Sequence, residues 1–351
     1  MNQPLTGPAD LAGRVTPRPV VVALVVTFNR LAQLQVTLAR LLSEDLDAVV
    51  VVDNASTDGT AAYLAGQANS RLRVIRLDRN GGGAGGFEQG LAAVMARYDP
   101  DWCVLMDDDA RPEPGAIAQF RTTEADPHQW EALAAGVFYP GGAICEMNRP
   151  SRNPFWHARQ FLRTLFGGGR SGFHVSDGDY QARTVQPIDA SSFVGFFVSR
   201  AAIARVGYPD GKLFIYGDDV LYTLKLSRAG GAIGFAPWLR FEHDCTTLRP
   251  GEGHIHRPLW KAYYNYRNGL LAYRTAAGPV LFWPVLAIVA VKWRMKASAY
   301  GPDRAIYLRL LGLAVRDALT GRLGRSHDDV LALAASRSPA AAAPGAADGA
   351  G

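Results

Sequence analysis

Cysteine is scarce in this sequence, and its three cysteines lie far apart. Cys103, Cys145 and Cys245 are the only ones in a chain of 351 residues, and no Cys-x-x-Cys pair occurs. This pattern argues against a disulfide framework and gives no indication of a cysteine-rich zinc site. Low cysteine usage of this kind fits a reducing compartment, so we expect a cytoplasmic protein.

The sequence also lacks an export signal and a long apolar run. Residues 1–18 show no charged segment followed by an apolar one, so we expect a flexible leader rather than a signal peptide. The longest apolar run, Pro279–Val291, has 13 residues and is followed by Lys292-Trp293-Arg294-Met295-Lys296. Because a spanning helix needs about 20 apolar residues, this run is predicted to lie peripherally at the inner face of the cell membrane.

Acidic residues are sparse near the C-terminus, where positive charge is concentrated. Residues 260–330 hold 11 Lys or Arg against 4 Asp, a net +7, which leaves −2 for the rest of a chain whose total is +5. Such a patch fits anionic lipid, a phosphate-bearing substrate or nucleic acid. No nucleic-acid-binding motif is recognisable, so nucleic acid is not an expected partner. A membrane or lipid-phosphate surface is favoured, with a plain solvated face as the alternative.

The apolar runs of the first 110 residues alternate between strand and helix patterns. Strands are predicted at 20–26, 48–52, 72–77 and 102–107, and helices at 31–42, from 60 onward and at 87–98. Continuous apolar strands that alternate with helices predict an α/β fold with a mostly parallel central sheet flanked by helices. Ligands of such sheets bind beyond the carboxyl ends of the strands.

The pattern beyond residue 110 is less regular. Further strands are predicted at 135–138, 193–198 and 232–235, a helix at 220–229, and a helical C-terminal extension from 259. The loop-rich stretch 141–189 could fold over a substrate. With 48% hydrophobic residues a substantial core is expected. The expected regions are a leader (1–18), an α/β domain (19–250), a helical region (251–330) and a disordered tail of Ala, Gly and Pro (331–351).

Three consecutive carboxylates, Asp107-Asp108-Asp109, follow the apolar run that ends at Met106. Like charges at the end of a buried strand are unfavourable unless a cation or protons neutralise them. Carboxylate oxygens suit Mg²⁺ or Mn²⁺, and these ions keep coordination positions open for phosphate oxygens. The triplet therefore predicts a metal site, with a solvated acidic turn as the alternative.

Polar residues also follow the other predicted strands. Asp53 could accept hydrogen bonds from a base or ribose, and Arg30 could hold a phosphate or a base edge, although turn or capping roles remain the alternatives. The glycine-rich loop from Asn80 to Gly86 could admit a diphosphate. This loop follows the third strand and lacks the Gly-x-Gly-x-x-Gly register after the first strand, so a nicotinamide-dependent oxidoreductase is disfavoured.

Two later positions carry possible chemistry. A carboxylate of Asp218-Asp219 could act as a general base towards an acceptor hydroxyl, and its alternative role is to cap the helix predicted from Val220. His243, in Phe241-Glu242-His243-Asp244, could be a third metal ligand or an ordinary structural histidine.

Taken in order, these motifs resemble the glycosyltransferase family 2 enzymes of the GT-A fold. The motifs are Val-Val-Thr-Phe-Asn-Arg (25–30), Val-Val-Asp-Asn-Ala-Ser-Thr-Asp-Gly-Thr (51–60), Arg-Asn-Gly-Gly-Gly-Ala-Gly-Gly-Phe (79–87), Met-Asp-Asp-Asp (106–109), Gly-Asp-Asp (217–219) and Glu-His-Asp (242–244). The loop 80–87 is similar to that of the galactofuranosyltransferase branch, which has rhamnosyltransferase-like relatives. The resemblance covers about residues 20–275.

The resemblance implies a role for each candidate residue. Donor-nucleotide contacts are expected from Thr27, Arg30, Asp53, Asn80, Gly85, Asp107 and Asp108. Asp107, Asp109 and His243 would bind Mn²⁺ or Mg²⁺. Asp219 matches the catalytic base, and Asp218 would support it or contact the acceptor. Gly195-Phe196-Phe197 stands where polymerising galactofuranosyltransferases carry tryptophans beside the acceptor, which leaves the acceptor open.

The expected activity is an inverting transfer from a nucleoside-diphosphate sugar to a hydroxyl of a glycan or a polyprenyl-diphosphate-linked acceptor in cell-surface polysaccharide biosynthesis. The metal would neutralise the departing diphosphate while Asp219 takes the proton of the attacking hydroxyl. UDP-galactofuranose is the first expected donor. A dTDP-rhamnose-dependent rhamnosyltransferase and a non-catalytic module that binds glycan or nucleotide are the alternatives.

Overall fold

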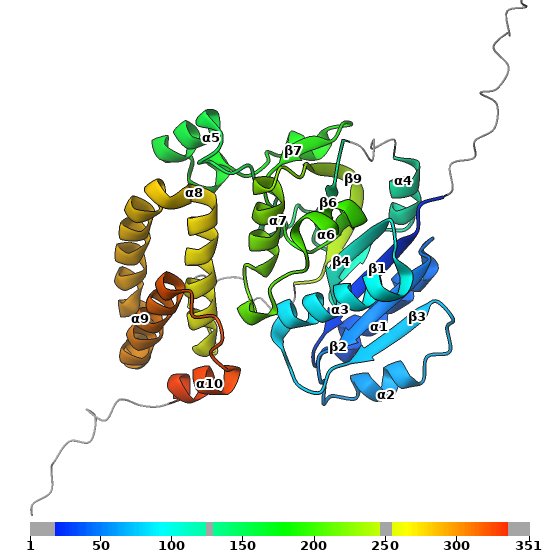
Figure 1. Ribbon diagram of the computed structural model, residues 1–351, viewed down its shortest axis with the longest axis horizontal. Helices are drawn as coiled ribbons and strands as arrows, with labels where there is room; N and C mark the ends of the chain where they lie inside the picture. The colour runs from blue at the N-terminus through cyan, green and yellow to red at the C-terminus, as the bar shows by residue number, and fades with distance from the viewer. Residues whose placement is uncertain (1–17, 124–128, 246–254, 336–351) are drawn as a thin grey trace, which may run out of the picture.

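The structure is a computed structural model that describes residues 18–123, 129–245 and 255–335. Figure 1 shows an α/β part and, beside it, a layer of C-terminal helices. The predicted leader lies outside the described residues except for Arg18.

The chain up to Asp107 forms the parallel part of the sheet, as predicted. Its elements are β1 (Val21–Thr27), α1 (Leu31–Ser43), β2 (Ala48–Asp53), α2 (Thr60–Ala65), β3 (Leu72–Arg76), α3 (Gly82–Tyr98) and β4 (Trp102–Asp107). These strands lie side by side in the order β3-β2-β1-β4. Every residue of β1 and β2 is buried, because helices cover both faces of the sheet.

The second half adds antiparallel strands, so the sheet is mixed. Its elements are β5 (Ala110–Pro112), α4 (Ala116–Thr122), β6 (Ala132–Phe138), β7 (Gln186–Ile188), β8 (Phe196–Ser199), α6 (Arg200–Val206), α7 (Asp218–Arg228) and β9 (Ile233–His243). The full order is β3-β2-β1-β4-β8-β6-β9-β5, with β7 paired to β9. β8 is antiparallel to both of its neighbours, whereas β6 and β9 run parallel.

The α3 helix begins at Gly82 rather than at the predicted Phe87. A Cβ added to Gly86 would come within 2.4 Å of the Val26 side chain, and one added to Gly90 within 2.6 Å of Leu24. These glycines therefore allow the helix to pack closely on the sheet. The sequence pattern alone suggested a loop there, since glycine normally disfavours helix interiors.

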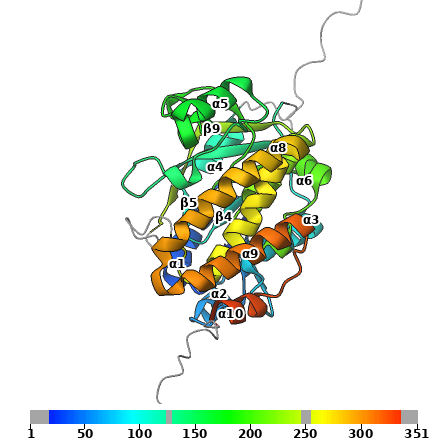
Figure 2. The same ribbon diagram turned by 90° about the vertical axis from the view of Figure 1, so that its left-hand side faces the viewer.

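The predicted loop-rich stretch contains only short elements. These are η1 (Glu146–Asn148), α5 (Ala158–Arg163), η2 (Thr164–Gly168), η3 (Gly169–Gly172) and η4 (Asp179–Gln181), where η marks short 3₁₀ or π turns. In Figures 1 and 2 this region lies at the top of the molecule near the bend of the long C-terminal helix. A hydrogen bond of 3.1 Å from the Asn153 side chain to the Ala276 carbonyl oxygen joins the two.

The helical C-terminal extension is confirmed. It comprises α8 (Trp260–Met295), η6 (Lys296–Asp303), α9 (Arg304–Thr320) and α10 (His327–Ala335). It contacts the α/β part at η5 (Gly211–Leu213), where Arg267 of α8 donates to the Leu213 carbonyl oxygen. α8 and α9 pack side by side (Figure 2), and the Tyr307 hydroxyl donates to the Trp293 carbonyl oxygen at 2.7 Å. The predicted start of the tail at 331 is too early, because α10 continues to Ala335; residues 336–351 lie outside the described part.

The α8 helix bends at Gly278, whose φ of +70° is followed by Pro279. The helical stretch Trp260–Thr320 holds an 18-residue window apolar enough to cross a membrane by length and composition, and 17% of that window is buried. Core helices of soluble proteins pass the same length and composition test, but their windows are mostly buried. The apolar surface beyond the bend is thus open in this chain.

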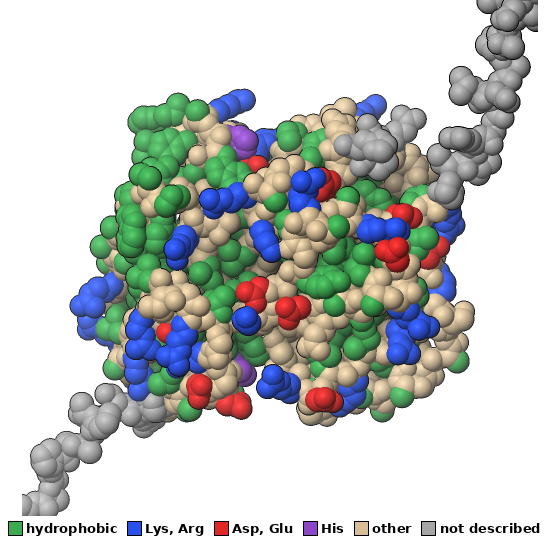
Figure 3. Space-filling model, viewed as in Figure 1, with side chains coloured by type: hydrophobic (Ala, Val, Ile, Leu, Met, Phe, Trp, Pro, Cys, Tyr) green, Lys and Arg blue, Asp and Glu red, His purple; other side chains and the backbone are tan. Residues whose placement is uncertain are grey.

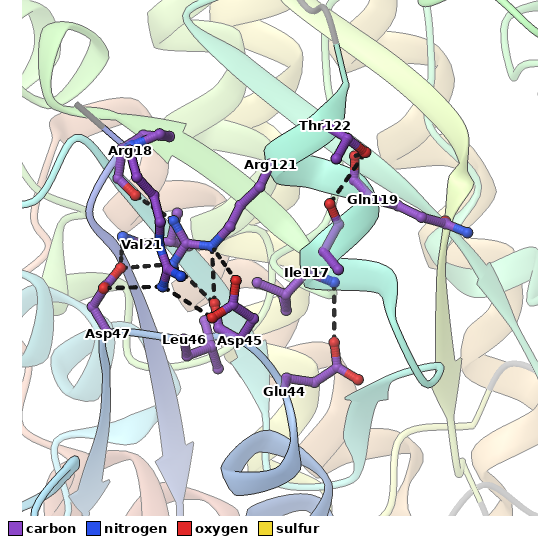
Figure 4. Close-up of polar contacts among 12 residues, drawn as sticks. Arg18, Val21, Glu44, Asp45, Leu46, Asp47, Ile117, Gln119, Arg121 and Thr122 are labelled. Carbon is purple, nitrogen blue, oxygen red and sulfur yellow. Dashed lines mark hydrogen bonds and ion pairs between the residues drawn. The ribbon is translucent and has the colours of Figure 1, made fainter. Parts of the chain in front are cut away.

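Charged side chains tie the opposite end of the sheet together (Figure 4). Arg121 of α4 pairs with Asp47 at 2.7 Å, and Asp47 accepts a hydrogen bond of 2.7 Å from the Val21 N–H at the start of β1. Glu44 accepts one of 3.1 Å from the Ile117 N–H in the first turn of α4. This cluster lies at the amino ends of the strands, away from the predicted site.

Candidate active site

The carboxyl ends of the parallel strands bring three predicted residues to one edge of the sheet. In the strand register Thr27 pairs with Asp53, and Asp107 pairs with Val26. Thr27, Asp53 and Asp107 therefore lie side by side at the carboxyl ends of three adjacent strands. Such an edge is where ligands bind in open α/β sheets.

His243 reaches the same edge from the last strand. It pairs with Ala110 across β5 and β9, and its Nε2 lies 3.1 Å from Asp109 Oδ1. Ligand atoms of Asp107, Asp109 and His243 all lie within 4.8 Å of one another. The predicted three-residue metal group is thus assembled, from residues more than 130 positions apart.

The electrostatics of this group favour a cation. Burial, with the neighbouring Asp109, raises the pKa of Asp107 to about 7. Burial alone would also raise the pKa of Asp109, but the hydrogen bond from His243 and the charge of Arg30 hold it below its usual value. Burial would lower the pKa of His243, yet Asp109 raises it to about 10. A proton and a guanidinium therefore partly neutralise the cluster.

Asp108 turns away from this group. Its carboxylate accepts a hydrogen bond of 2.7 Å from the Thr27 hydroxyl and lies 3.4 Å from the Arg30 guanidinium. Arg30 also pairs with Asp109 at 2.8 Å. Burial raises the pKa of Asp108 to about 6 against the lowering effect of Arg30. The three predicted donor-site residues Thr27, Arg30 and Asp108 form one connected network.

Asn148, from the loop-rich stretch, holds His243 in place, and sequence reasoning missed it. Its Oδ1 lies 2.7 Å from His243 Nδ1, and both side chains are buried. A carbonyl oxygen can only accept, so Nδ1 must carry a proton. In the neutral ring this leaves the lone pair on Nε2, which faces the carboxylates. A lone Asn in a loop gives no sequence signal for this role.

Asp53 and Asn54 organise the end of β2. Asp53 accepts a hydrogen bond of 2.8 Å from the Ser56 N–H and pairs with Arg76 at 2.6 Å. Asn54 accepts from the Gly81 N–H at 2.9 Å and donates to the Gly82 carbonyl oxygen at 2.8 Å. Asn54, not singled out from the sequence, therefore anchors the glycine-rich loop to the sheet.

The glycine-rich loop contacts the segment that carries the second acidic pair. Asn80 Oδ1 accepts from the Gly82 N–H at 2.8 Å. Gly82 has a φ of +74°, and an added Cβ would come within 2.0 Å of the Phe214 carbonyl oxygen. Gly85 has open space where a Cβ would stand. Gly82 is thus needed for close packing on Phe214, whereas Gly85 leaves space free at the helix start.

Asp218 and Asp219 stand in the first turn of α7 rather than before it. Asp219 Oδ1 accepts a hydrogen bond of 2.7 Å from its neighbour's N–H, that of Val220. Burial raises the pKa of Asp219 to about 6; burial and Asp219 together raise the pKa of Asp218 well above its usual value. Asp107 adds to the rise at Asp218, and Asp219 adds to that at Asp107. The two acidic sites therefore lie close enough for each to raise a carboxyl pKa in the other.

The segment before Asp218 is strained and is held by α8. Phe214, Tyr216 and Gly217 all have φ between +67° and +74°, a conformation that costs about 1 kcal/mol or more for each non-glycine residue. The buried Asn268 side chain donates to the carbonyl oxygens of Ile215 and Tyr216 at 2.9 and 2.8 Å. The C-terminal helix thus fixes the loop that presents the second acidic pair.

Arg267 completes this support. It is fully buried and donates to the carbonyl oxygens of Lys212 and Leu213 at 3.0 and 2.9 Å.

Phe196 and Phe197, which the sequence resemblance placed beside the acceptor, are fully buried in β8 and pack in the core. Phe28, directly after β1, and Tyr216 are the exposed aromatic residues beside the polar clusters.

Comparison with known proteins supports the same reading of these motifs. Residues 22–164 match the family model "Glycosyl transferase family 2". The chain is 30% identical over 264 residues to the galactofuranosyltransferase GlfT1 of Mycolicibacterium smegmatis, covering 72% of this chain and 83% of the relative.

Two solved structures are similar in fold. Residues 1–349 of Staphylococcus aureus TarS, in complex with UDP-GlcNAc, align with a TM-score of 0.52 at 15% identity over 87% of this chain and 82% of that TarS segment. GalNAc-T7, with UDP, GalNAc and Mn²⁺, aligns with a TM-score of 0.51 at 13% identity over 74% of this chain and 48% of that protein. Both likenesses concern the fold, and both are consistent with a GT-A arrangement of the sheet.

Proposed function

Since the chain belongs to glycosyltransferase family 2, we propose that it is an inverting, metal-dependent transferase. It moves a sugar from a nucleoside diphosphate to a hydroxyl of a glycan or a polyprenyl-diphosphate-linked acceptor. The observation that carries this proposal is the proximity of two acidic sites. One holds Asp107 with Asp109 and His243, the other holds Asp218 with Asp219, and carboxylates of each site raise a pKa in the other.

The residues present fit a hard divalent cation. Asp107, Asp109 and His243 would hold Mn²⁺ or Mg²⁺, since two carboxylates and one imidazole within 4.8 Å match the ligands these ions take. The raised pKa of Asp107 is the signature of a carboxylate that lacks a neutralising charge. When bound, the cation supplies charge neutralisation to a departing diphosphate.

Asp219 is the proposed general base. A pKa of about 6 leaves it ionised at neutral pH but basic enough to take a hydroxyl proton in the transition state. Asp218, whose pKa burial and the neighbouring Asp219 raise well above its usual value, is proposed to support Asp219 or to contact the acceptor. Attack on the face opposite the leaving group then inverts the anomeric carbon in one displacement.

Thr27, Arg30, Asp53, Asn80 and Gly85 are the proposed donor-nucleotide residues, with Asp108 positioned by Thr27 and Arg30. The planar fork of Arg30 suits phosphate oxygens. Arg30 pairs with Asp108 and Asp109 at 3.4 and 2.8 Å, so it stands beside the residues that would hold the cation and would be placed to bind a phosphate oxygen of the donor. UDP-galactofuranose is the proposed donor, because a galactofuranosyltransferase is 30% identical to this chain over 264 residues.

The test is a donor panel with purified protein and Mn²⁺, scored by release of nucleoside diphosphate and by product mass. UDP-galactofuranose, UDP-galactopyranose and dTDP-rhamnose are compared with the same acceptors. Turnover that disappears in Asp219→Asn, while nucleotide still binds, supports the proposal. Nucleotide binding without turnover of any donor in the wild type would instead indicate a non-catalytic binding module.

We also propose that the protein acts peripherally on the inner face of the cell membrane. Apolar side chains gather over α5, η2 and α8 (Figure 3). The exposed apolar side chains of this surface include Leu162, Leu165, Phe166, Val280, Trp283 and Ile288, and Phe166 and Val280 are 80% and 79% exposed. Arg159, Arg163 and Arg170 lie in the same segment as the first three. Apolar side chains beside arginines suit an anionic lipid surface.

Sedimentation with anionic phosphatidylglycerol vesicles at low salt tests the membrane proposal. The double variant Leu165→Asp and Phe166→Asp should bind at least several-fold less, because aspartates oppose both insertion and anionic lipid. Val36→Asp, at a 51% exposed apolar position on α1, is the matched control and should bind as the wild type does. Wild-type protein that stays wholly soluble with these vesicles would refute the proposal.

A further inference from the structure

Two of the three cysteines meet beside the acidic cluster, although a hundred residues separate them. The Sγ atoms of Cys145 and Cys245 lie 4.0 Å apart. Cys145 Sγ also lies 3.1 Å from Asn148 Oδ1, the atom that contacts His243 Nδ1 at 2.7 Å. Sequence spacing gave no indication of this arrangement, because β6 and β9 pair only in the folded sheet.

We propose that Cys145, Cys245 and His243 form a second metal site, selective for a soft divalent cation such as Zn²⁺. One ligand atom from each of the three residues lies within 4.8 Å of the other two. The site goes beyond the proposed sugar transfer, since no step of that reaction uses a thiol. It is distinguished from the carboxylate site by its ligands, because thiolates prefer Zn²⁺ whereas carboxylates suit Mn²⁺ and Mg²⁺.

The distance between the two sulfur atoms favours a cation over a disulfide. Two thiolates at about 2.3 Å from a tetrahedral Zn²⁺ lie about 3.8 Å apart, close to the observed 4.0 Å. A disulfide requires about 2.05 Å, so the sulfur atoms would have to approach by about 2 Å. For a metal, the distance between the two sulfur atoms needs to change by only about 0.2 Å.

The surroundings allow an ion to enter and to complete its coordination. Cys145 and His243 are buried, while Cys245 is partly exposed and offers a route from solvent. Asn148 Oδ1, at 3.1 Å from Cys145 Sγ and 2.7 Å from His243 Nδ1, lies closer to both atoms than a tetrahedral fourth ligand would, so water would complete the coordination. Three protein ligands with two sulfur atoms and one imidazole are a frequent zinc-binding set.

The two metal sites cannot both use His243 in its neutral form. Its Nδ1 faces Asn148, whose Oδ1 also contacts the Cys145 thiol, and its Nε2 faces Asp109. If Nδ1 binds Zn²⁺, the ring proton must sit on Nε2, where it can donate to Asp109 but cannot bind a second cation. Occupation of the thiol site therefore removes the imidazole ligand from the carboxylate site, and Zn²⁺ should antagonise Mn²⁺.

Cobalt titration of the full chain tests the site without an activity assay. Co²⁺ bound to thiolates gives an intense charge-transfer absorption in the near ultraviolet, which carboxylate ligands do not give. Wild-type protein should show this band and lose it on addition of Zn²⁺. Cys145→Ser and Cys245→Ser should each abolish it, whereas Cys103→Ala, at a buried cysteine in β4, should retain it.

Activity and protection measurements complete the experiment. Loss of a residue that hydrogen-bonds to a metal ligand weakens metal binding by roughly 10–100-fold. Cys145 and Cys245 are proposed direct ligands, so replacing either one should raise the Zn²⁺ concentration that inhibits Mn²⁺-dependent turnover by at least that factor. Zn²⁺ should also protect both cysteines of wild-type protein from alkylation, which needs no variant. A wild type without the cobalt band, or without Zn²⁺ protection, would overturn the site whether or not sugar transfer is observed.

Discussion

Replacing Asp107 by Asn should stabilise the metal-free protein and abolish its activity. A carboxyl group with a pKa of 3.8 in the unfolded chain and about 7 in the folded one is more easily protonated when folded. The folded chain therefore binds more protons than the unfolded chain between about pH 4 and pH 7, so stability falls as the pH rises through this window. Asn carries no charge and removes this loss.

The magnitude follows from the same pKa difference. One pKa unit corresponds to about 1.4 kcal/mol, so the ionised Asp107 costs about 4 kcal/mol at pH 7. The attraction of the charged His243 is already contained in this pKa, because it lowers the value that burial and Asp109 raise. We therefore expect a stabilisation of about 4 kcal/mol at pH 7.5 and about 2 kcal/mol at pH 5.

Urea unfolding with a metal chelator, followed by circular dichroism at both pH values, measures this difference. Excess Mn²⁺ should stabilise the wild type more than the variant, since a cation neutralises the same carboxylate. A variant that is less stable than the wild type at pH 7.5, or a difference that does not grow with pH, would refute the assignment of a desolvated carboxylate at the metal site.

Three further predictions concern the base, its support and the opposite end of the sheet. The turnover number should fall about tenfold per pH unit below pH 6, because Asp219, with a pKa raised to about 6, acts only when ionised; a flat profile from pH 5 to pH 8 contradicts its role. Asn268→Ala should lower the turnover number by at least tenfold with little change in donor binding, because the carbonyl oxygens of Ile215 and Tyr216 lose their hydrogen-bond donor, a loss of about 1–3 kcal/mol each. Asn265→Ala is the control on the same helix, and equal effects of the two variants would argue against a role of Asn268 in holding the loop. Glu44→Ala should lower the free energy of unfolding by about 2 kcal/mol, since the N–H groups of Gly115 and Ile117 lose their acceptor, with turnover unchanged; a loss of turnover at full stability would contradict this.

The parallel half of the sheet and its polar edge follow from the sequence because the pattern there is local. Apolar runs of five to seven residues are followed at once by Thr27, Asp53 and Asp107, and parallel strands place such residues at one edge. The strand ending at Asp107 and the helix from residue 31 were predicted at their observed positions. Periodicity and strand direction are sufficient for this part.

The other half of the site depends on contacts that no local pattern carries. His243 reaches Asp109 because β9 continues for eleven residues and pairs with both β5 and β6. The apolar pattern instead predicted one strand at 232–235 and a separate strand-like run before His243. Asn148 and Cys145 approach His243 from a stretch that looked like loop alone. Their roles follow from the pairing of distant segments, so the three widely separated cysteines gave a misleading impression of isolation.

The C-terminal region shows why summed charge is a poor guide to surface charge. The net +7 over residues 260–330 includes Arg267, which is fully buried and donates to the segment before Asp218, and Arg325, which pairs with the buried Asp317 at 3.0 Å. These cations bind groups inside the protein and cannot meet a lipid headgroup. Membrane affinity should therefore depend on the arginines of α5 and on the apolar surface beyond Gly278, while the first half of α8 supports the proposed active site.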